Sequence, residues 1–316
     1  MNAKHLLVPT AHSVVLLKEP MQRRWAIAPL FALPLLALGG CSWVQDVDHR
    51  GVSAPATGPL PRPVRTAWVL SSGGPRGFAH VGVLKALDEL KLRPDLVVGA
   101  SIGALVACLY AGGMPIADME KLALDFSLLS MVRPSLGNPG GEKISAAAVA
   151  AMLNTMLGNR TLEQLPIATA VVAMQQSSRE LVAFTRGDPG VAVQASTAVE
   201  GTLAPVQIRG TTYVDPDLGT PMPVRVAQAL GAVRILAVDV SAHEWKAPAG
   251  SDRYRAGDLR KRALTEPEAR AATFTLHPEF SYYVNLGRAF REHAIRAGYE
   301  TTIAQAKALR AAFAPG

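Results

Sequence analysis

The segment that decides the fold is residues 66–104, TAWVLSSGGPRGFAHVGVLKALDELKLRPDLVVGASIGA. It holds two copies of one arrangement, in which an apolar run leads into a glycine-containing turn and then into an apolar helical pattern. The predicted strands cover residues 66–72 and 95–99, and the predicted helices cover 77–90 and 104–111. Strands joined by helical crossovers are parallel and are covered on both faces. The segment therefore predicts an α/β fold of three layers, α/β/α, with a mainly parallel central sheet.

The rest of the chain continues this alternation. Apolar periodicity and turn residues predict helices at 116–129, 144–157, 191–198 and 224–230, strands at 167–174, 180–185 and 233–238, and a hairpin of 206–208 with 212–214. Residues 133–141 are predicted to be a Pro/Gly loop. The polar stretch 244–270 is predicted to be a mobile surface insertion, and residues 282–313 are predicted to be helical.

Composition excludes several classes of protein. The chain has 316 residues, of which 49% are hydrophobic and 18% charged, and it has only two cysteines. Disordered, collagenous and disulfide-rich proteins do not have this composition. The net charge is +7, but without residues 1–40 the count is 28 Lys and Arg against 24 Asp and Glu, a net charge of +4. These charges form no dense basic run, so nucleic acid is not an expected partner.

The N-terminal segment has the pattern of an export signal. Residues 25–40, WAIAPLFALPLLALGG, are uncharged, follow Arg23 and Arg24, and precede Cys41. The run is too short and too interrupted by proline for an ordinary membrane-spanning helix. We expect residues 1–40 to be a signal peptide, and Met21 is a possible true start.

The residues Leu38-Gly39-Gly40-Cys41 resemble the lipobox of bacterial lipoproteins. That resemblance implies cleavage before Cys41 and acylation of Cys41 as a membrane anchor; the alternative is an ordinary signal peptide with an unrelated cysteine. The non-acidic Ser42 favours export to an outer membrane, facing the periplasm. Residues 42–65 are rich in Pro, Gly and polar residues and predict an extended tether. Cys108, within an apolar helical pattern, is predicted to be a small core residue.

Ser101 is the first candidate catalytic residue. The pentapeptide Gly99-Ala100-Ser101-Ile102-Gly103 matches G-x-S-x-G and stands between a predicted strand and a predicted helix, as a nucleophile elbow requires. Glycine on both sides permits a sharp turn that lifts the hydroxyl out of the sheet at a helix N-terminus, where a developing anion is favoured. The alternative is a Gly/Ser helix N-cap.

Two further segments are candidates for the same site. Residues 72–77, SGGPRG, follow the first strand, and their backbone N–H groups are suited to an anion. A dinucleotide-binding turn with Asp95 as ribose ligand is the less favoured alternative, because Ser72 interrupts the glycine pattern. Residues 213–223, YVDPDLGTPMP, place an acid in a proline-rich turn after a short strand, where it can face a cleft.

Together these motifs resemble the patatin-like phospholipase family, in the family's own order. Residues 73–77 with 78–84 are similar to its glycine-rich oxyanion loop and first helix, and residues 98–104 to its nucleophile elbow. Residues 195–198 with Gly201 resemble the segment before its catalytic acid, and residues 215–223 resemble the acid turn. The resemblance covers residues 66–238.

The resemblance implies a patatin-like lipid acyl hydrolase with a Ser-Asp dyad, no cofactor and no metal. Ser101 would be the nucleophile and Asp215 the general base. Backbone N–H groups of Gly73, Gly74 and Arg76 would stabilise the oxyanion. The expected substrates are phospholipids or related acyl esters, and the expected location is a membrane surface reached through the anchor at Cys41.

Two positions depart from the family pattern. The family's acid turn usually reads Asp-Gly-Gly or Asp-Gly-Ala, whereas here Asp215 precedes Pro216 and Asp217. Proline restricts both its own φ and the residue before it, which could displace the carboxylate and leave Asp217 as the alternative acid. Ser72 replaces the first glycine of the loop, a milder change.

Two alternatives remain open. A Ser-acid-His triad would use Asp215 or Asp239 as the acid and His243, His277 or His293 as the base, in the chain order of α/β-hydrolases. His80 is expected to face outward or to cap locally, with no catalytic role. The second alternative is a lipid-binding or envelope-assembly lipoprotein that keeps the fold without turnover. For either function we expect residues 66–245 to form the main, catalytic-type domain, and residues 246–316 to supply the insertion and helices that pack on it.

Overall fold

An eight-stranded sheet forms the centre of the molecule, with strand order β11-β10-β2-β3-β6-β9-β8 and with β7 paired to β6. The computed structural model describes residues 44–45, 47–125, 127, 132–136 and 144–313. The strands of this sheet are β2 (Thr66–Leu70), β3 (Leu96–Ala100), β6 (Ala168–Gln175), β7 (Leu181–Phe184), β8 (Val206–Ile208), β9 (Thr211–Val214), β10 (Arg234–Val238) and β11 (Phe274–Leu276).

The sheet is mainly parallel, as the sequence predicts. Strands β11, β10, β2, β3 and β6 run parallel to one another, whereas β7 and β9 pair with β6, and β8 with β9, in antiparallel fashion. Parallel register places Leu70, at the end of β2, beside Gly99 near the end of β3. The loops that follow β2 and β3 therefore leave the sheet at the same edge, which is where open α/β sheets build their sites.

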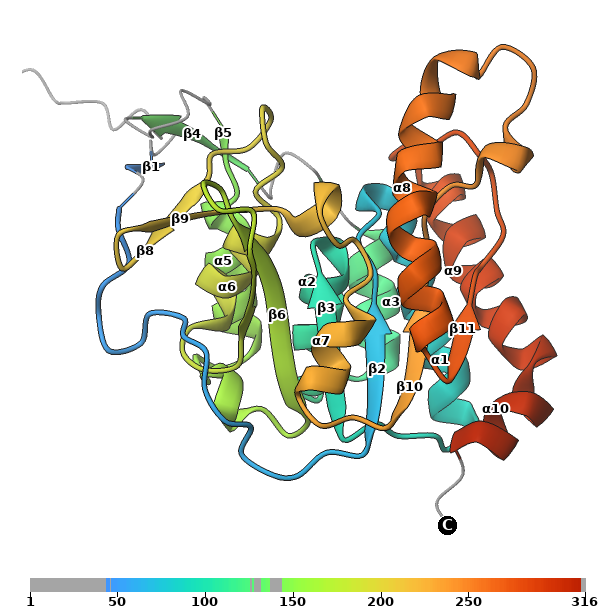
Figure 1. Cartoon of the computed structure of the whole chain (residues 1–316), viewed down its shortest axis with the longest axis horizontal. Helices are drawn as coiled ribbons and strands as arrows, with labels where there is room; N and C mark the ends of the chain where they lie inside the picture. Colours follow the sequence, from blue (N-terminus) through green and yellow to red (C-terminus); the bar gives the residue numbers. More distant parts are fainter. Residues whose placement is uncertain (1–43, 46, 126, 128–131, 137–143, 314–316) are drawn as a thin grey trace, which may run out of the picture. The chain divides into compact units, whose positions relative to one another are not determined.

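Helices cover both faces of the sheet, so the architecture has three layers (Figure 1). Side chains of β2 alternate, with Ala67 and Val69 in one buried cluster and Trp68 and Leu70 in the other. The helices packed on the Trp68 face are α1 (Phe78–Glu89), α2 (Ile102–Ala111), α3 (Ile116–Leu124), α5 (Ala147–Met156), α6 (Pro189–Ser196), α9 (Arg288–Ala304) and α10 (Ala306–Phe313). The Ala67 face carries α7 (Val224–Ala229) and α8 (Asp252–Ala271).

Helix α9 crosses α1 at two glycines. A Cβ atom on Gly82 would lie 1.8 Å from the carbonyl oxygen of Ile295, and one on Gly298 would lie 2.1 Å from that of Ala79. Only glycine lets two helix backbones approach so closely. The C-terminal helix is thus held directly against the first helix of the domain.

Several predicted boundaries were wrong for tertiary reasons. The helix predicted from residue 116 ends at Leu124, and the helix predicted from residue 144 begins at Ala147. Part of the predicted loop 133–141 is a strand, β4 (Arg133–Leu136), which pairs with β1 (Val44–Gln45) and β5 (Ile144–Ser145) in a small second sheet. Such pairing with distant segments gives no local signal in the sequence. Residues 137–143 of that loop lie outside the described residues.

The polar stretch predicted to be a surface insertion is mostly the 20-residue helix α8. Its residues include many helix formers, but its surface is polar nearly all round, so the apolar period that signals a helix is missing. The strand β11 follows α8 and adds a parallel edge strand to the sheet beside β10. The stretch after residue 245 therefore contributes to the central sheet as well as to its cover.

Residues 47–65, which follow β1 within the predicted tether, lie along the folded domain (Figure 1). Ala54 and Val64 are 5% and 7% exposed, and the N–H of Thr185 donates to the carbonyl of Ala56 at 3.1 Å. Arg62 donates to the carbonyl of Pro166 at 2.5 Å. This segment is attached to the domain at several points, contrary to the expectation of a free extended tether.

The predicted signal peptide and Cys41 lie outside the described residues, so the structure does not bear on them. No helix in the described part of the chain has both the length and the apolar character needed to span a bilayer. Cys108 is fully buried in α2, as predicted for a core residue, and burial raises the pKa of its thiol.

Candidate active site

Ser101 stands on a strained turn between β3 and α2. Its φ of 54° and ψ of −126° are unusual for a residue with a side chain, as expected of a nucleophile elbow. A Cβ atom on Gly99 would lie 2.4 Å from the Cα of Ala104, and one on Gly103 would lie 2.2 Å from the carbonyl oxygen of Leu70. The two predicted elbow glycines are therefore required for the strand and the helix to approach each other.

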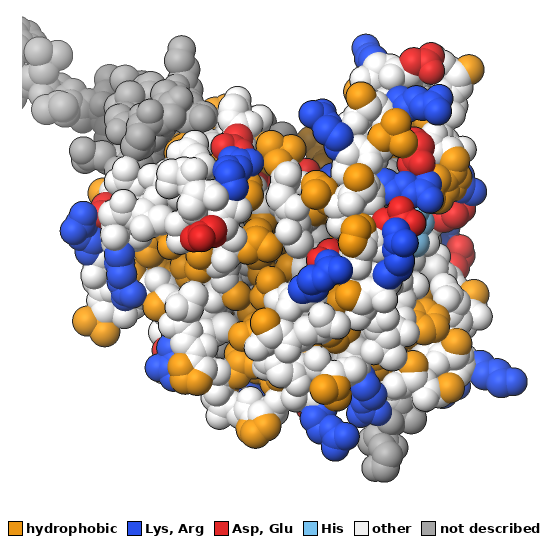
Figure 2. Space-filling view, in the orientation of Figure 1, with side chains coloured by type: hydrophobic (Ala, Val, Ile, Leu, Met, Phe, Trp, Pro, Cys, Tyr) orange, Lys and Arg blue, Asp and Glu red, His pale blue; other side chains and the backbone are white. Residues whose placement is uncertain are grey.

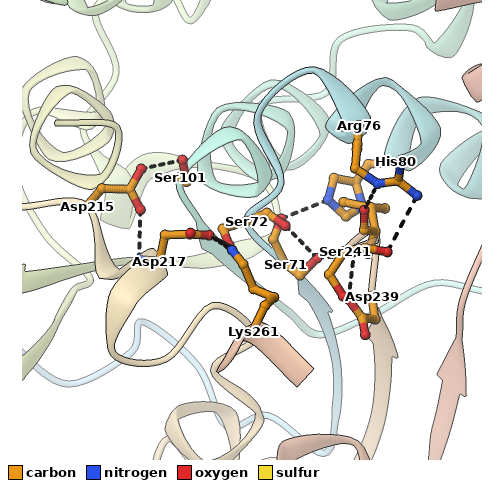
Figure 3. A network of polar contacts seen from close by, with 11 residues as sticks. Ser71, Ser72, Arg76, His80, Ser101, Asp215, Asp217, Asp239, Ser241 and Lys261 are labelled. Atoms are coloured by element: carbon orange, nitrogen blue, oxygen red, sulfur yellow. Dashed lines mark hydrogen bonds and ion pairs between the residues drawn. The ribbon is translucent and has the colours of Figure 1, made fainter. Parts of the chain in front are cut away.

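The Ser101 hydroxyl donates a hydrogen bond to Asp215, with 2.5 Å between Oγ and Oδ2 (Figure 3). Asp215 follows β9 and caps the short helix η3 (Pro216–Leu218), whose Asp217 N–H donates to the other carboxylate oxygen at 2.9 Å. The backbone N–H of Asp215 donates to the carbonyl of Ala198 at 2.9 Å. The serine and the acid, 114 residues apart in the chain, are thus joined directly.

Pro216 does not displace the carboxylate. Asp215 has a φ of −58° and a ψ of 131°, a conformation compatible with a following proline. Pro216 occupies the first position of η3, where an N–H would have no helical partner. Asp217, the alternative acid, faces Ser72 and Lys261, and its carboxylate makes no bond to Ser101 among the contacts of the described residues.

Asp215 is 3% exposed, and this burial raises the pKa of its carboxyl group from 3.8 to about 7. The bond from Ser101 opposes the increase, the nearby charge of Asp217 adds to it, and Lys261 opposes it. A carboxylate whose pKa lies near neutrality can accept and return a proton under ordinary conditions.

The glycine-rich segment forms the short helix η1 (Gly74–Gly77) with Gly73 as its N-cap, and a Cβ atom on Gly77 would lie 2.5 Å from the side chain of Ile102, the neighbour of Ser101. The N–H groups of Gly73 and Gly74 donate to no other group within the described part of the protein. The N–H of Arg76, by contrast, donates to the carbonyl of Gly73 at 3.1 Å. Arg76 is therefore a less favoured oxyanion donor than Gly73 and Gly74, because a 3₁₀ turn already uses its N–H.

The side chain of Arg76 instead holds the loop in place. Its guanidinium donates to the carbonyl of Val240 at 2.7 Å and to that of Ser281 at 3.0 Å, and it lies 4.3 Å from the centre of the Phe280 ring. His80 is also structural, but it is fully buried and does not face outward as expected. Its Nε2 lies 2.9 Å from the carbonyl oxygen of Ser71, and burial lowers its pKa to about 4.

Ser196 is a site residue whose role the sequence did not reveal. The backbone N–H of Ser101 donates to the Ser196 hydroxyl at 2.8 Å, which in turn donates to the carbonyl of Val172 at 2.6 Å. This chain of bonds fixes the elbow to α6 and β6. The resemblance of residues 195–198 to the segment before the family's catalytic acid pointed to this region, but it gave no indication of this bond.

The three histidines considered for a triad, which all lie in the described part of the chain, make no hydrogen bond to Ser101. His243 and His277 contact Asp239, with His243 Nε2 at 3.6 Å and His277 Nδ1 at 3.7 Å from Asp239 Oδ2, and Ser101 bonds to Asp215 instead. Burial alone would raise the pKa of Asp239, but the imidazoles and hydrogen bonds at Ser241 lower it to about 2. His293 lies on α9.

Asp239, His243 and His277 bring possible metal-ligand atoms within 4.8 Å of one another. The sequence analysis did not anticipate that these residues could form a metal site. Their geometry does not suit an ion. The ring centroids of His243 and His277 lie 3.6 Å apart and their planes differ by 7°, so the nitrogen lone pairs of the two rings lie in separate, nearly parallel planes. Imidazole ligands of one ion must direct their lone pairs at a common point.

Two cavities meet at Ser101 and Gly74. One, of about 290 Å³, is bounded mainly by apolar side chains of α1, α2 and α3, such as Phe78, Leu105 and Met119. The other, the polar cavity of about 920 Å³, also has apolar side chains in its wall, but it holds the charged groups of η3 and α8, including Asp217 and Lys261. The surface is hollowed beside α8, and basic side chains gather on that helix (Figure 2). The serine thus lies between an apolar cavity and a polar one.

The fold and this site place the chain among α/β proteins that carry a serine on a strand-to-helix elbow. Residues 68–227, half of the chain, match the patatin-like phospholipase family, and the chain belongs to that family.

An uncharacterized NTE family protein of Mycobacterium tuberculosis is 32% identical over 185 residues, covering 57% of this chain and 50% of that protein. The human patatin-like phospholipase domain-containing protein 6 is 28% identical over 184 residues, covering 56% of this chain and 13% of that protein. The chain thus spans about half the length of its mycobacterial relative. Among solved structures, VipD from Legionella pneumophila aligns with a TM-score of 0.45 and 14% identity, covering 78% of this chain and 67% of VipD.

Proposed function

We propose that the protein is a serine acyl hydrolase that cleaves acyl esters of lipids through a Ser101–Asp215 dyad. The observation that carries the proposal is the 2.5 Å bond between the Ser101 hydroxyl and a buried carboxylate, at the point where an apolar and a polar cavity meet. An ester of a fatty acid and a polar alcohol has the same two-sided character, with its reacting carbonyl at the junction. A relative in Coccidioides immitis, 29% identical over 191 residues, is named a lysophospholipase, which supports single-chain phospholipids as first substrates to test.

The proposed reaction has two balanced halves. Ser101 Oγ attacks the ester carbonyl as its proton moves to Asp215, and the N–H groups of Gly73 and Gly74 stabilise the resulting oxyanion. The intermediate collapses with loss of the alcohol, which takes the proton from Asp215 and leaves an acyl-serine. Water then attacks that ester while Asp215 accepts its proton, and the fatty acid departs as the proton returns to Ser101.

A fluorophosphonate probe and ester hydrolysis test this proposal together. We expect the probe to modify Ser101, and both Ser101→Ala and Asp215→Asn to lower kcat by at least about 10³-fold for a lysophospholipid and for p-nitrophenyl esters. His277→Ala and His293→Ala should retain turnover. Hydrolysis by Ser101→Ala equal to that of the unmodified protein would instead support the lipid-binding alternative, and loss of turnover in a folded histidine variant would support a triad.

The second part of the proposal concerns location. The lipobox-like sequence before Cys41 supports export and acylation, which would hold the domain at an outer membrane facing the periplasm, where lipid esters are concentrated in two dimensions. Metabolic labelling with a palmitate analogue should mark the full chain and should not mark Cys41→Ala. Equal labelling of both would contradict the anchor without affecting the proposal for the dyad.

A further inference from the structure

Three side chains from distant parts of the sequence meet at the edge of the proposed dyad. Ser72 follows β2 and directly precedes Gly73, Asp217 lies in η3 two residues after Asp215, and Lys261 lies on α8. The Ser72 hydroxyl donates to the Asp217 carboxylate, and Lys261 forms an ion pair with the same carboxylate (Figure 3). Lys261 Nζ also lies 3.4 Å from Ser72 Oγ.

These contacts join the two loops that serve the reaction. Ser72 and Asp217 are both positions at which the sequence departs from the family pattern, the one replacing a glycine of the oxyanion loop and the other replacing the glycine or alanine of the acid turn. In the structure these two residues contact each other, and Lys261 places a positive charge beside the negative charge of Asp217. The side chains of Lys261 and Asp217 are 21% and 32% exposed, so solvent only partly screens the pair.

The ion pair of Asp217 and Lys261 also affects the electrostatic environment of the Asp215 carboxyl group. Asp217 brings a second negative charge close to the buried carboxylate, because its own N–H donates to Asp215 Oδ1. The charge of Asp217 raises the pKa of Asp215, and that of Lys261 lowers it. The other charged residues around the polar cavity are Arg76, Glu200, Asp258 and Arg260. The guanidinium of Arg76 donates to backbone carbonyls. The cation that forms an ion pair with the acid turn is Lys261.

We propose that Lys261 is a positioning residue of the active site, which fastens the acid turn to the oxyanion loop through Asp217 and Ser72 and offsets the charge of Asp217 beside Asp215. This inference rests on the proposed function of the dyad. It gives α8 a role in the site that the family motifs do not contain, since Lys261 lies beyond the matched residues 68–227.

The proposal predicts opposite effects for the two members of the ion pair. Asp215 acts as a base in its ionised form, so kcat/KM rises with pH through its pKa. Lys261→Met leaves the negative charge of Asp217 uncompensated. The rising limb of the profile of kcat/KM against pH should then move to higher pH by about half a unit or more. Asp217→Asn removes the charge and should move the limb to lower pH. The double variant should lie between them, close to the unmodified protein.

The experiment measures kcat/KM for a p-nitrophenyl ester, and the rate of modification by a fluorophosphonate, from pH 5 to 9. For Lys261→Met we expect about a threefold loss below the limb and recovery above it, and we expect Lys261→Arg to restore the original profile. Lys246→Met is the matched control, because Lys246 carries the same charge in an exposed ion pair with Glu279 and lines neither cavity. Its profile should not change.

Two results would overturn the proposal. One is a pH profile of kcat/KM whose rising limb is unchanged in both Lys261→Met and Asp217→Asn. The other is a decrease in kcat/KM of Lys261→Met that is equal at every pH, which indicates a merely structural effect. Failure of the dyad itself gives a different result, because Asp215→Asn, or both Ser101→Ala and Asp215→Asn, would then turn over the ester at the rate of the unmodified protein. In that event, the titration of Asp215, followed by ¹³C NMR of labelled aspartate and assigned with Asp215→Asn, still tests the opposite shifts without any turnover.

Discussion

At the scale of single residues, Asp215 combines almost complete burial with an ionisable group. Its carboxylate accepts hydrogen bonds from Ser101 and from the Asp217 N–H, and these bonds only partly offset the loss of hydration. The pKa of about 7 follows from that imbalance. The same burial that makes Asp215 a suitable base at neutral pH therefore destabilises the folded protein once the group is ionised.

Asp215→Asn should therefore stabilise the protein at alkaline pH. The folded-state pKa of about 7 lies above the unfolded value near 3.8, so the contribution of Asp215 to stability is present below pH 3.8 and is lost as the pH rises towards 7. Asparagine stays neutral; its amide oxygen can accept from the Asp217 N–H while its NH2 group donates to the Ser101 hydroxyl oxygen. At pH 8 we expect the free energy of unfolding to increase by about 2–4 kcal/mol, and by less at pH 5.

Urea unfolding at the two pH values measures this difference. Asp118→Asn is a suitable control, since Asp118 is an exposed acid in the first turn of α3, and its replacement should change stability by less than about 1 kcal/mol. A variant at position 215 that is less stable than the unmodified protein at pH 8 would show that the ionised carboxylate is better satisfied than its burial indicates.

At the scale of elements, α2 links the elbow to the apolar cavity. Ser101 precedes its first turn, and Leu105, one turn later, is 7% exposed and lines that cavity. Met119 of α3 lines the same cavity. One helix thus presents both the proposed nucleophile and the surface against which an acyl chain would lie, so a change in that surface should alter chain-length preference without moving the elbow.

Leu105→Trp tests this arrangement. The larger ring should occupy space that a long acyl chain needs, so kcat/KM for p-nitrophenyl decanoate should fall about tenfold or more, while that for the acetate ester stays within about twofold. Kinetics with the two esters on one purified variant provide the comparison, and the acetate ester is the internal control. Equal losses on both esters would mean that the cavity does not hold the acyl chain.

Elements also differ in how well the sequence predicts them. The two strand-turn-helix units around Gly73 and Ser101 were predicted because each is encoded within about 25 consecutive residues. The strand β11 and the small sheet of β1, β4 and β5 were missed, since pairing with distant segments creates them. Lys261 was missed for a related reason: a lysine on a polar helix has no signature until tertiary structure brings it to Asp217.

At the scale of the whole molecule, the stretch that precedes the first strand of the central sheet, residues 47–65, is part of the fold. Residues 47–65 were expected to be free, because their composition has no periodicity, yet Ala54 and Val64 are buried against the domain. Composition indicates the conformation that a segment adopts in isolation. It does not show whether the segment packs on a neighbouring surface of the domain. The domain defined by sequence motifs therefore begins later than the folded unit.

A chain that begins at Thr66 should consequently be less stable than one that begins at Val44. It lacks two buried apolar side chains and the backbone bond from Thr185 to Ala56, and we expect a loss of about 2–4 kcal/mol in the free energy of unfolding. Urea denaturation of both chains measures the loss, and a chain that begins at Val47 controls for the effect of shortening. Indistinguishable midpoints for all three would show that the segment contributes nothing.

The meeting of the two cavities at Ser101 has a consequence for the order in which products leave. In the proposed reaction, cleavage of the ester bond leaves the acyl chain attached to Ser101 in the apolar cavity, while the alcohol leaves through the polar cavity. The vacated space is also the route by which water arrives, so any small alcohol present competes with it for the acyl group. Transfer of the acyl group to another alcohol and its hydrolysis would then be two outcomes of one acyl-serine intermediate. Whether an alcohol or water enters the polar cavity first would decide between them.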